Sequence, residues 1–227
     1  MKRYVFIVIL ILFVSALFSE DMQYKDIQSA YKKSYDYEIM QKYDKAIKAL
    51  SDVYRNYPES YTVNYRLGWL YYLNKNYSNA YTHLAKALAV FPSSVEVLNT
   101  IDLIYAATQE WSKLEANAVK IINIDYYNNY ANYWYSYALK KQGKLDLALK
   151  VDYKMLALFP SSVSFLTELA ENLYLSGSVD LAKEKFMDIL ILDSMNETAK
   201  YYLKLIEEQK KKGAKNETDN KKNSGKN

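Results

Sequence analysis

The chain has 227 residues, and its 30 basic and 26 acidic side chains give it a formal net charge of +4. Only three of the basic residues are arginines and the lysines are mixed with acids, so the sequence predicts no nucleic-acid binding, which needs a one-faced basic patch. The absence of cysteine excludes disulfides and lipid attachment through a cysteine. One histidine and five glycines offer neither a metal-binding cluster nor a glycine-rich phosphate loop. The composition therefore predicts a protein that is not an enzyme, with no cofactor and no metal.

Residues 1–19 are typical of a secretory signal peptide. Lys2 and Arg3 precede an apolar run from Val5 to Phe18, and acidic residues follow it. The run is about 14 residues long, shorter than the ~18–20 residues that span a bilayer. We therefore expect cleavage and export to a periplasmic or secreted location, with residues 20–26 as a short lead. The alternative is an uncleaved segment that anchors the protein in the inner membrane.

A phrase in the middle of the chain occurs twice. AVFPSSVEVL at 89–98 and ALFPSSVSFL at 157–166 stand 68 residues apart, which is twice 34. Other columns keep the same period of 34 residues: Ala46, Ala80, Ala148 and Ala182 form one, and Tyr43, Tyr77 and Trp111 form another. Self-similarity at this spacing indicates a repeat architecture. The sequence predicts five units, at about 27–60, 61–94, 95–128, 129–162 and 163–196.

Each unit has the pattern of two helices. In the second unit, apolar residues recur at helical spacing on both sides of the turn NKN, namely Leu67, Leu70 and Tyr71 before it and Ala80, Leu84 and Ala87 after it. Turns as short as NKN, KQGK and LSGS make the two helices antiparallel. Gly68 and Ala80 are small enough to let the helices approach closely, while Leu84 fills the space between them. The sequence thus predicts stacked helical hairpins.

This pattern resembles the tetratricopeptide repeat family over about residues 27–194. The second unit carries the family's residues best: Leu67, Gly68, Tyr71, Tyr77, Ala80, Leu84, Ala87 and Pro92. The resemblance implies an all-α fold, a right-handed α-solenoid of five tetratricopeptide-like helix-turn-helix repeats with a concave groove.

Four residues depart from the family's columns. The third unit has Asp102 where a small residue is expected, Ala118 where a large one is expected and Tyr126 in place of proline, and the fourth has Asp152 in a core column. We expect the third unit to be the least stable part of the stack. We expect the two acids to turn toward solvent or to bond a tyrosine hydroxyl, because an unpaired buried carboxylate is costly.

The C-terminal segment changes character near residue 212. Ala199, Tyr202, Leu203 and Ile206 share one helical face, which predicts a capping helix over 197–211. The Lys/Asn-rich residues 212–227 show no apolar periodicity and are predicted to be disordered.

The resemblance also implies which residues line the groove, because the family uses the second, fifth, ninth and twelfth positions of the first helix in each repeat. The expected partner-binding residues are Tyr31, Tyr35, Tyr65, Trp69, Tyr72, Tyr130, Tyr133, Tyr137, Lys140 and Tyr174. The same columns hold Glu38, Thr62 and Glu96. Tyrosine and tryptophan dominate binding hot spots. The alternative is that the 25 tyrosines reflect coding bias and packing.

Two further features narrow the function. The family's carboxylate clamp needs Lys and Asn at positions that Tyr31 and Tyr35 occupy here, which argues against that ligand. His83 is more typical of a packing residue than of a base or a metal ligand. The sequence therefore predicts a non-enzymatic scaffold or assembly factor that binds a protein or peptide in an aromatic groove within an envelope compartment. The alternative is a membrane-anchored structural subunit whose repeats mediate self-association.

Overall fold

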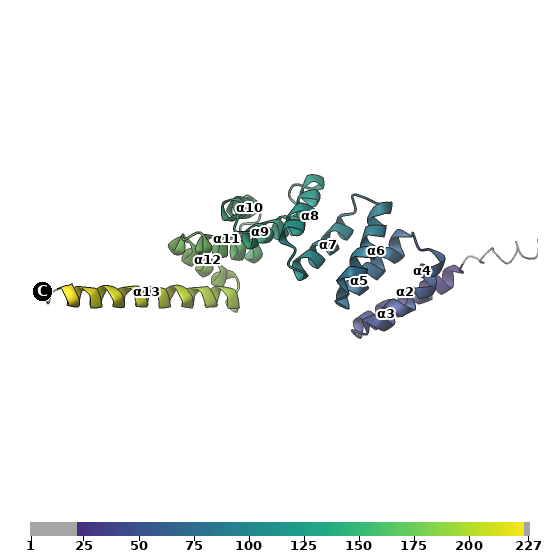
Figure 1. The fold of residues 1–227 in the computed structure, drawn as a ribbon, viewed down its shortest axis with the longest axis horizontal. Coiled ribbons are helices and arrows are strands. Elements are labelled where there is room, and N and C mark those ends of the chain that lie inside the picture. The colour runs from purple at the N-terminus through teal and green to yellow at the C-terminus, as the bar shows by residue number, and fades with distance from the viewer. Residues whose placement is uncertain (1–21, 225–227) are drawn as a thin grey trace, which may run out of the picture. The chain divides into compact units, whose positions relative to one another are not determined.

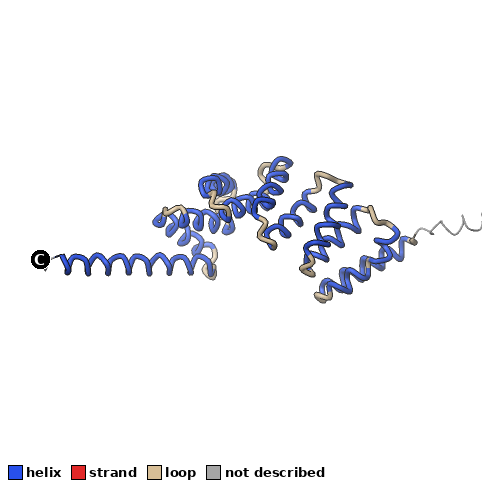
Figure 2. Tube along the Cα trace, viewed as in Figure 1, coloured by secondary structure: helices blue, strands red, loops and turns tan. Residues whose placement is uncertain are grey.

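The computed structural model describes residues 22–224, and side chains within residues 22–212. All regular structure in this part of the chain is helical (Figures 1 and 2). The chain divides into two compact units, Met1–Ile104 and Tyr105–Asn227. The boundary falls inside a helix of the third predicted repeat. None of the described helices combines the length and apolarity that a membrane crossing requires, and the N-terminal apolar run lies outside the described residues.

Each predicted repeat contains one helical hairpin, which confirms the all-α solenoid fold. Unit 1 holds α2 (Tyr24–Ile39), α3 (Tyr43–Ala49), α4 (Ser51–Asn56), α5 (Tyr61–Leu73), α6 (Tyr77–Val90) and the part of α7 (Val95–Ala107) up to Ile104. Unit 2 holds the rest of α7 with α8 (Trp111–Ile124), α9 (Asn129–Lys141), α10 (Leu145–Leu158), α11 (Val163–Leu175), α12 (Val179–Leu192) and α13 (Glu197–Ser224).

The turns inside the hairpins share one left-handed residue. It recurs every 34 residues, with φ between 55° and 87°, at Gln41, Lys75, Gln109, Gly143 and Gly177. The residue after it donates a backbone hydrogen bond to the carbonyl five positions back, as Asn76 does to Tyr71 at 2.9 Å. This bond satisfies a carbonyl that the helix end would leave unpaired. A left-handed conformation costs free energy for any residue but glycine, so three of the five turns carry strain that Gly143 and Gly177 avoid.

Unit 1 shows why the second repeat needs its small residues. A Cβ added to Gly68 on α5 would lie 2.6 Å from Cγ of Leu84 on α6, so the glycine permits the close crossing. Leu84, Ala80 and Ala87 are fully buried, as the repeat columns predicted. The first repeat differs slightly, because its second helix is interrupted at the buried residue Leu50, which separates α3 from α4.

Unit 2 ends in α13, which covers the last hairpin. Ala199 and Ile206 of α13 are buried in one core with Phe186 and Leu169, and Tyr202 stacks on the ring of Phe186 with centroids 4.8 Å apart. The predicted apolar face of the capping helix is therefore confirmed. The cap closes the hydrophobic surface that the fifth repeat would otherwise expose.

The end of α13 differs from the prediction. The helix does not stop at residue 211 but continues to Ser224, so the prediction of disorder from residue 212 is wrong up to that point. Low hydrophobicity prevents a segment from folding alone, but adding residues to an existing helix costs much less than starting one. The lysines and glutamates of this segment are also good helix formers.

Candidate functional site: an aromatic pocket in unit 1

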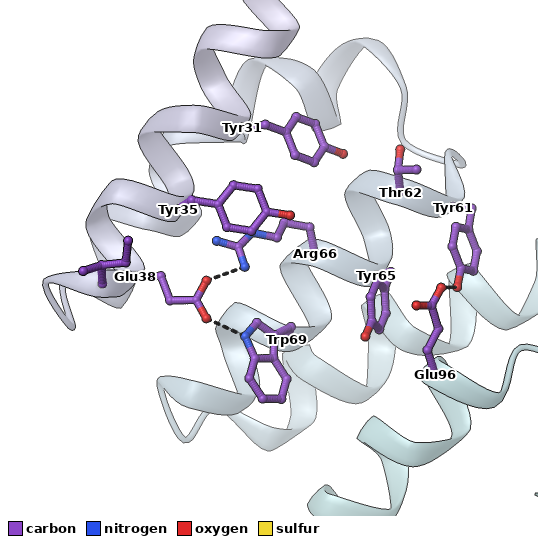
Figure 3. Close-up of a pocket in the computed structure, with 10 residues that line it drawn as sticks. Tyr31, Tyr35, Glu38, Tyr61, Thr62, Tyr65, Arg66, Trp69 and Glu96 are labelled. Carbon is purple, nitrogen blue, oxygen red and sulfur yellow. Dashed lines mark hydrogen bonds and ion pairs between the residues drawn. The ribbon is translucent and has the colours of Figure 1, made fainter.

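A pocket of about 680 Å³ lies between α2, α5 and the first turn of α7 (Figure 3). It is lined by Tyr31, Tyr35, Glu38, Ile39, Tyr61, Thr62, Tyr65, Arg66, Trp69 and Glu96. Five of these side chains are aromatic. Helical spacing explains the gathering, because residues three or four apart share one helix face, as Tyr61, Tyr65 and Trp69 do along α5. The sequence thus places two ring-bearing helix faces opposite each other.

One wall of the pocket is held by a charged pair between the first two repeats. Arg66 on α5, only 6% exposed, forms an ion pair with Glu38 on α2 and donates from Nε to Ser34 Oγ at 2.9 Å. The guanidinium lies 3.8 Å from the centroid of the Tyr35 ring, within cation–π range. The second oxygen of Glu38 accepts a hydrogen bond from Trp69 Nε1 at 2.7 Å. The pair neutralises its own charges and fixes the orientation of two rings.

The opposite wall carries a carboxylate. The Tyr61 hydroxyl donates a hydrogen bond to Glu96 Oε1, and it also lies 2.9 Å from Ser94 Oγ. Burial and the bond to Glu96 raise the pKa of Tyr61 to about 12, so the phenol stays neutral and remains a donor. The rings of Tyr61 and Tyr65 stack with centroids 6.0 Å apart. Burial raises the pKa of Tyr65 as well, and the Glu96 charge adds to that rise.

A second cavity of about 550 Å³ adjoins this wall. Its lining includes Phe91, Pro92 and Ser94, and it shares Tyr61 and Glu96 with the first pocket. The Phe91 ring packs edge-on against Tyr61 with centroids 5.0 Å apart. Glu96 therefore stands where two largely apolar hollows meet.

Four of the predicted partner-binding residues line the first pocket, and one residue of unit 1 does not. Tyr31, Tyr35, Tyr65 and Trp69 contribute rings to it. Tyr72 instead packs between Trp69 and Tyr77, with ring centroids 5.6 and 6.1 Å away. The last of the four helix positions that the family assigns to the groove therefore turns away from this pocket in α5.

The predicted tyrosines of unit 2 lie among other rings. On α9, the rings of Tyr130, Tyr133 and Tyr137 each contact Trp134, at centroid distances from 5.2 to 6.1 Å. Burial raises the pKa of Tyr133 to about 12. Tyr174 is covered by α13, because it packs on Tyr202 at 5.1 Å and accepts a hydrogen bond from Gln209 at 2.7 Å.

Lys140 forms ion pairs inside unit 2. Its side chain is 5% exposed, and its ammonium pairs with Glu168, at 2.8 Å, and with Glu171 on α11. Burial disfavours the charged form, but the two carboxylates outweigh it and raise the pKa of Lys140. The contact of Lys140 with a partner stays a prediction, and its ammonium would have to leave two carboxylates to make it.

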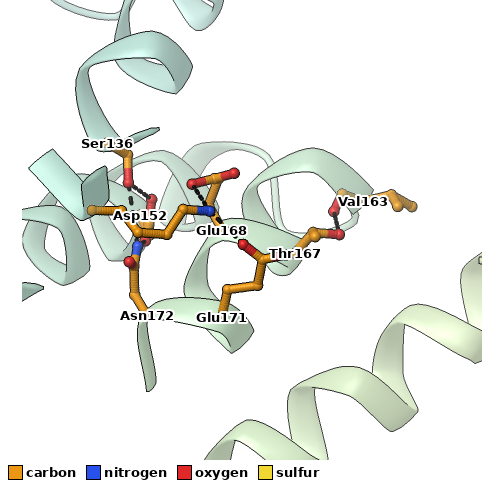
Figure 4. Close-up of polar contacts among 8 residues, drawn as sticks. Ser136, Asp152, Val163, Thr167, Glu168, Glu171 and Asn172 are labelled. Atoms are coloured by element: carbon orange, nitrogen blue, oxygen red, sulfur yellow. Dashed lines mark hydrogen bonds and ion pairs between the residues drawn. The ribbon is translucent and has the colours of Figure 1, made fainter. Parts of the chain in front are cut away.

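The two acids in core columns are both buried, and Asp152 differs from the prediction. Asp102 and Asp152 are both fully buried, so neither turns toward solvent. Asp152 accepts hydrogen bonds from Ser136 at 2.5 Å and from Asn172 at 2.7 Å, and no tyrosine is involved (Figure 4). Burial raises the pKa of Asp152 to about 7, although these two donors act against the shift. The fourth repeat thus accommodates its acid by surrounding it with donors.

Sequence reasoning missed three residues of the pocket, namely Ile39, Tyr61 and Arg66, which lie outside the family's four groove positions. Arg66 and Tyr61 each form a hydrogen bond or ion pair with a residue of a neighbouring repeat. A usable indication for Arg66 was its rarity, because it is one of three arginines and stands within a helix of tyrosines and tryptophan. Tyr61 had no such indication, because its role depends on the acid at Glu96 one repeat later.

His83 lies among aromatic rings of unit 1. His83 packs between the rings of Tyr54 and Tyr71 and bonds Asn64 at 2.9 Å, and burial lowers the pKa of its imidazole. Within residues 22–212, no group of three or more His, Cys, Asp or Glu side chains is arranged to hold a metal ion.

Helical hairpins at a constant period define a helical-repeat protein of the α-solenoid class. A family model described as tetratricopeptide repeat matches residues 31–95. The chain thus resembles tetratricopeptide repeat proteins over its first two repeats. No curated protein matches it.

Solved structures share the fold. MamA 41-end from Desulfovibrio magneticus RS-1 is 14% identical, with a TM-score of 0.69 over 76% of this chain and 97% of that one. MamA MSR-1 is 22% identical, with a TM-score of 0.62 over 74% and 98% of the two chains. YrrB, a TPR protein with an unusual peptide-binding site, is 13% identical, with a TM-score of 0.66 over 80% and 94%.

Proposed function

We propose that this chain is a non-enzymatic scaffold or assembly factor that binds a segment of a partner protein in the pocket of unit 1. The observation that supports it most is the set of five rings around one open hollow, two of which the Glu38–Arg66 pair holds in place. Rings held in this way offer apolar contact area without a large loss of rotamer entropy on binding. The fold shared with YrrB, a peptide-binding repeat protein, agrees with this use.

The test compares a pocket residue with a core residue. Trp69 is part-exposed and lines the pocket, whereas Leu84 is fully buried between α5 and α6. A hot-spot aromatic is worth about 2 kcal/mol or more of binding, so Trp69→Ala should weaken partner binding roughly thirtyfold or more and keep most of the thermal stability. Leu84→Ala should instead lose about 2–5 kcal/mol of folding stability.

Trp69→Phe serves as the matched control, because it keeps a ring and removes the hydrogen bond to Glu38. It should bind more tightly than Trp69→Ala. If Trp69→Ala unfolds the protein as severely as Leu84→Ala, Trp69 is a core residue and the proposal fails.

The compartment forms the second part of the proposal. Residues 1–19 carry the pattern of a cleaved export signal, which supports a periplasmic or secreted protein whose mature chain begins between about 17 and 20. Mass spectrometry of the native protein tests this. An intact Met1 in the membrane fraction would favour the alternative, an anchored subunit whose repeats self-associate.

A further inference from the structure

The pocket has one carboxylate whose charge is not matched. Glu38 is saturated by Arg66 and Trp69. Glu96 is exposed, and it accepts a hydrogen bond from the neutral hydroxyl of Tyr61. Within residues 22–212, no lysine or arginine forms an ion pair with Glu96. The accessible charge of the pocket is therefore negative.

The surroundings of Glu96 suit one kind of ligand group. The stacked rings of Tyr61 and Tyr65 stand beside the carboxylate (Figure 3). A lysine or arginine side chain can lay its methylene groups and its charge against such rings while its end group reaches the carboxylate. Arg66 on Tyr35 shows the same stacking inside the protein, at 3.8 Å. An anionic ligand would instead meet Glu96 without a free cation to receive it.

We propose that the pocket recognises a lysine or arginine side chain of its partner segment, with the cation at Glu96 and flanking apolar side chains in the two hollows that meet there. This inference rests on the proposed function and specifies its ligand chemistry. The partner we infer is a separate basic protein segment. A single carboxylate offers too few ligands for a metal ion, so the ligand is an organic cation.

The experiment uses the full chain and three labelled peptides that differ only at a central position, which is lysine, norleucine or glutamate between leucines. Norleucine keeps the methylene chain of lysine and removes the ammonium. Fluorescence anisotropy should show that the wild-type protein binds the lysine peptide at least about tenfold more tightly than the norleucine peptide, and the glutamate peptide most weakly.

Glu96→Gln should remove the preference for lysine, because the amide keeps the shape and loses the charge. Glu184→Gln removes the same charge from an exposed position on α12 and should leave the preference intact. Equal binding of the lysine and norleucine peptides, or a preference that persists in Glu96→Gln, would overturn the inference, as would no binding of any peptide. If Trp69→Ala weakens all three peptides equally while they bind alike, the proposed function stands and the inference about the cation fails.

The lysine-rich end of a second copy is the other possible occupant. Analytical ultracentrifugation at the peptide-binding concentrations distinguishes it. Wild-type protein that remains monomeric supports a separate partner, whereas self-association that Glu96→Gln abolishes would overturn the choice of partner.

Discussion

The first and last repeat pairs place side chains at the same positions and use them differently. Lys140 occupies the repeat position of Glu38 three periods later, and Glu168 and Glu171 occupy those of Arg66 and Trp69. Both sets form ion pairs between neighbouring repeats, with the charges exchanged. The repeat thus determines which positions lie in contact, while the residue types determine which repeat supplies the cation and which the carboxylate.

The two repeat pairs also differ in their aromatic residues. Tyr31 and Tyr35 have their equivalents in Tyr133 and Tyr137, but the facing positions change from Tyr61, Tyr65 and Trp69 to Val163, Thr167 and Glu171. Unit 1 therefore has rings on both sides of its pocket. In unit 2, Glu171 stands at the position of Trp69 and forms an ion pair with Lys140. A side chain at a groove position can contact a ligand only where it is not already paired with a residue of the adjacent repeat.

The largest expected effect comes from breaking the buried pair. Lys140→Met leaves Glu168, whose side chain is 4% exposed, without its cation and should cost about 3–5 kcal/mol of unfolding free energy. Glu38→Gln also removes the carboxylate of a buried cation, Arg66, but the amide oxygen can still accept a hydrogen bond from it and the Glu38 side chain is 23% exposed, so the loss should be smaller, about 1–2 kcal/mol. Chemical denaturation measures both. Equal losses of unfolding free energy would contradict the account, because they would mean that the Lys140–Glu168 and Glu38–Arg66 pairs are equally shielded from water.

The buried carboxyl of Asp152 should make the stability of the protein depend on pH. Its folded pKa of about 7 lies above the ordinary 3.8, so between about pH 4 and 7 the folded protein keeps a proton that the unfolded chain has lost. Unfolding free energy must then fall as pH rises through this window. The Asp152→Asn variant has no titrating group at this position. Relative to it, the wild-type protein should lose about 2–4 kcal/mol of unfolding free energy between about pH 4 and 7. Parallel pH profiles of the two proteins would show that Asp152 titrates normally.

Hydrogen exchange tests the third repeat, where the two compact units divide. Its unusual Asp102 is fully buried, and Ala118 replaces a large residue in the core. We expect amides of α8 to open with a free energy at least about 1 kcal/mol below those of α6. Slower exchange in α8 than in α6 would contradict the expectation.

The smallest effects belong to the turns. Lys75 is left-handed at φ 59°, and Gly177 holds the same position at φ 87°. Lys75→Gly should stabilise unit 1 by about 0.5–1 kcal/mol, and Gly177→Ala should destabilise unit 2 by a similar amount. Thermal unfolding of both variants measures the difference. Shifts of the same sign would show that the shared backbone conformation does not control these turns.

Much of this arrangement could be predicted from the sequence, because it follows from period and residue size. The contact of Gly68 with Leu84 and the apolar face of α13 are of this kind. The ion pairs of Lys140 were not predicted, because its two carboxylates lie one repeat later on α11. The site of Asp152 was not predicted either, because its donors come from α9 and α11 and need three helices to be placed first. The hydrogen bond of Tyr61 with Glu96 likewise joins two repeats.

Site-specific photo-crosslinking tests the central claim most directly. A benzoyl-phenylalanine at Tyr65 samples the pocket of unit 1, and one at Thr167 samples the equivalent position three repeats later, which is also half-buried. In cells, the account predicts a crosslinked partner from the Tyr65 position and little or none from the Thr167 position. Equal crosslinking at both positions, or crosslinking at Thr167 alone, would contradict the claim that the partner binds through the aromatic pocket of unit 1.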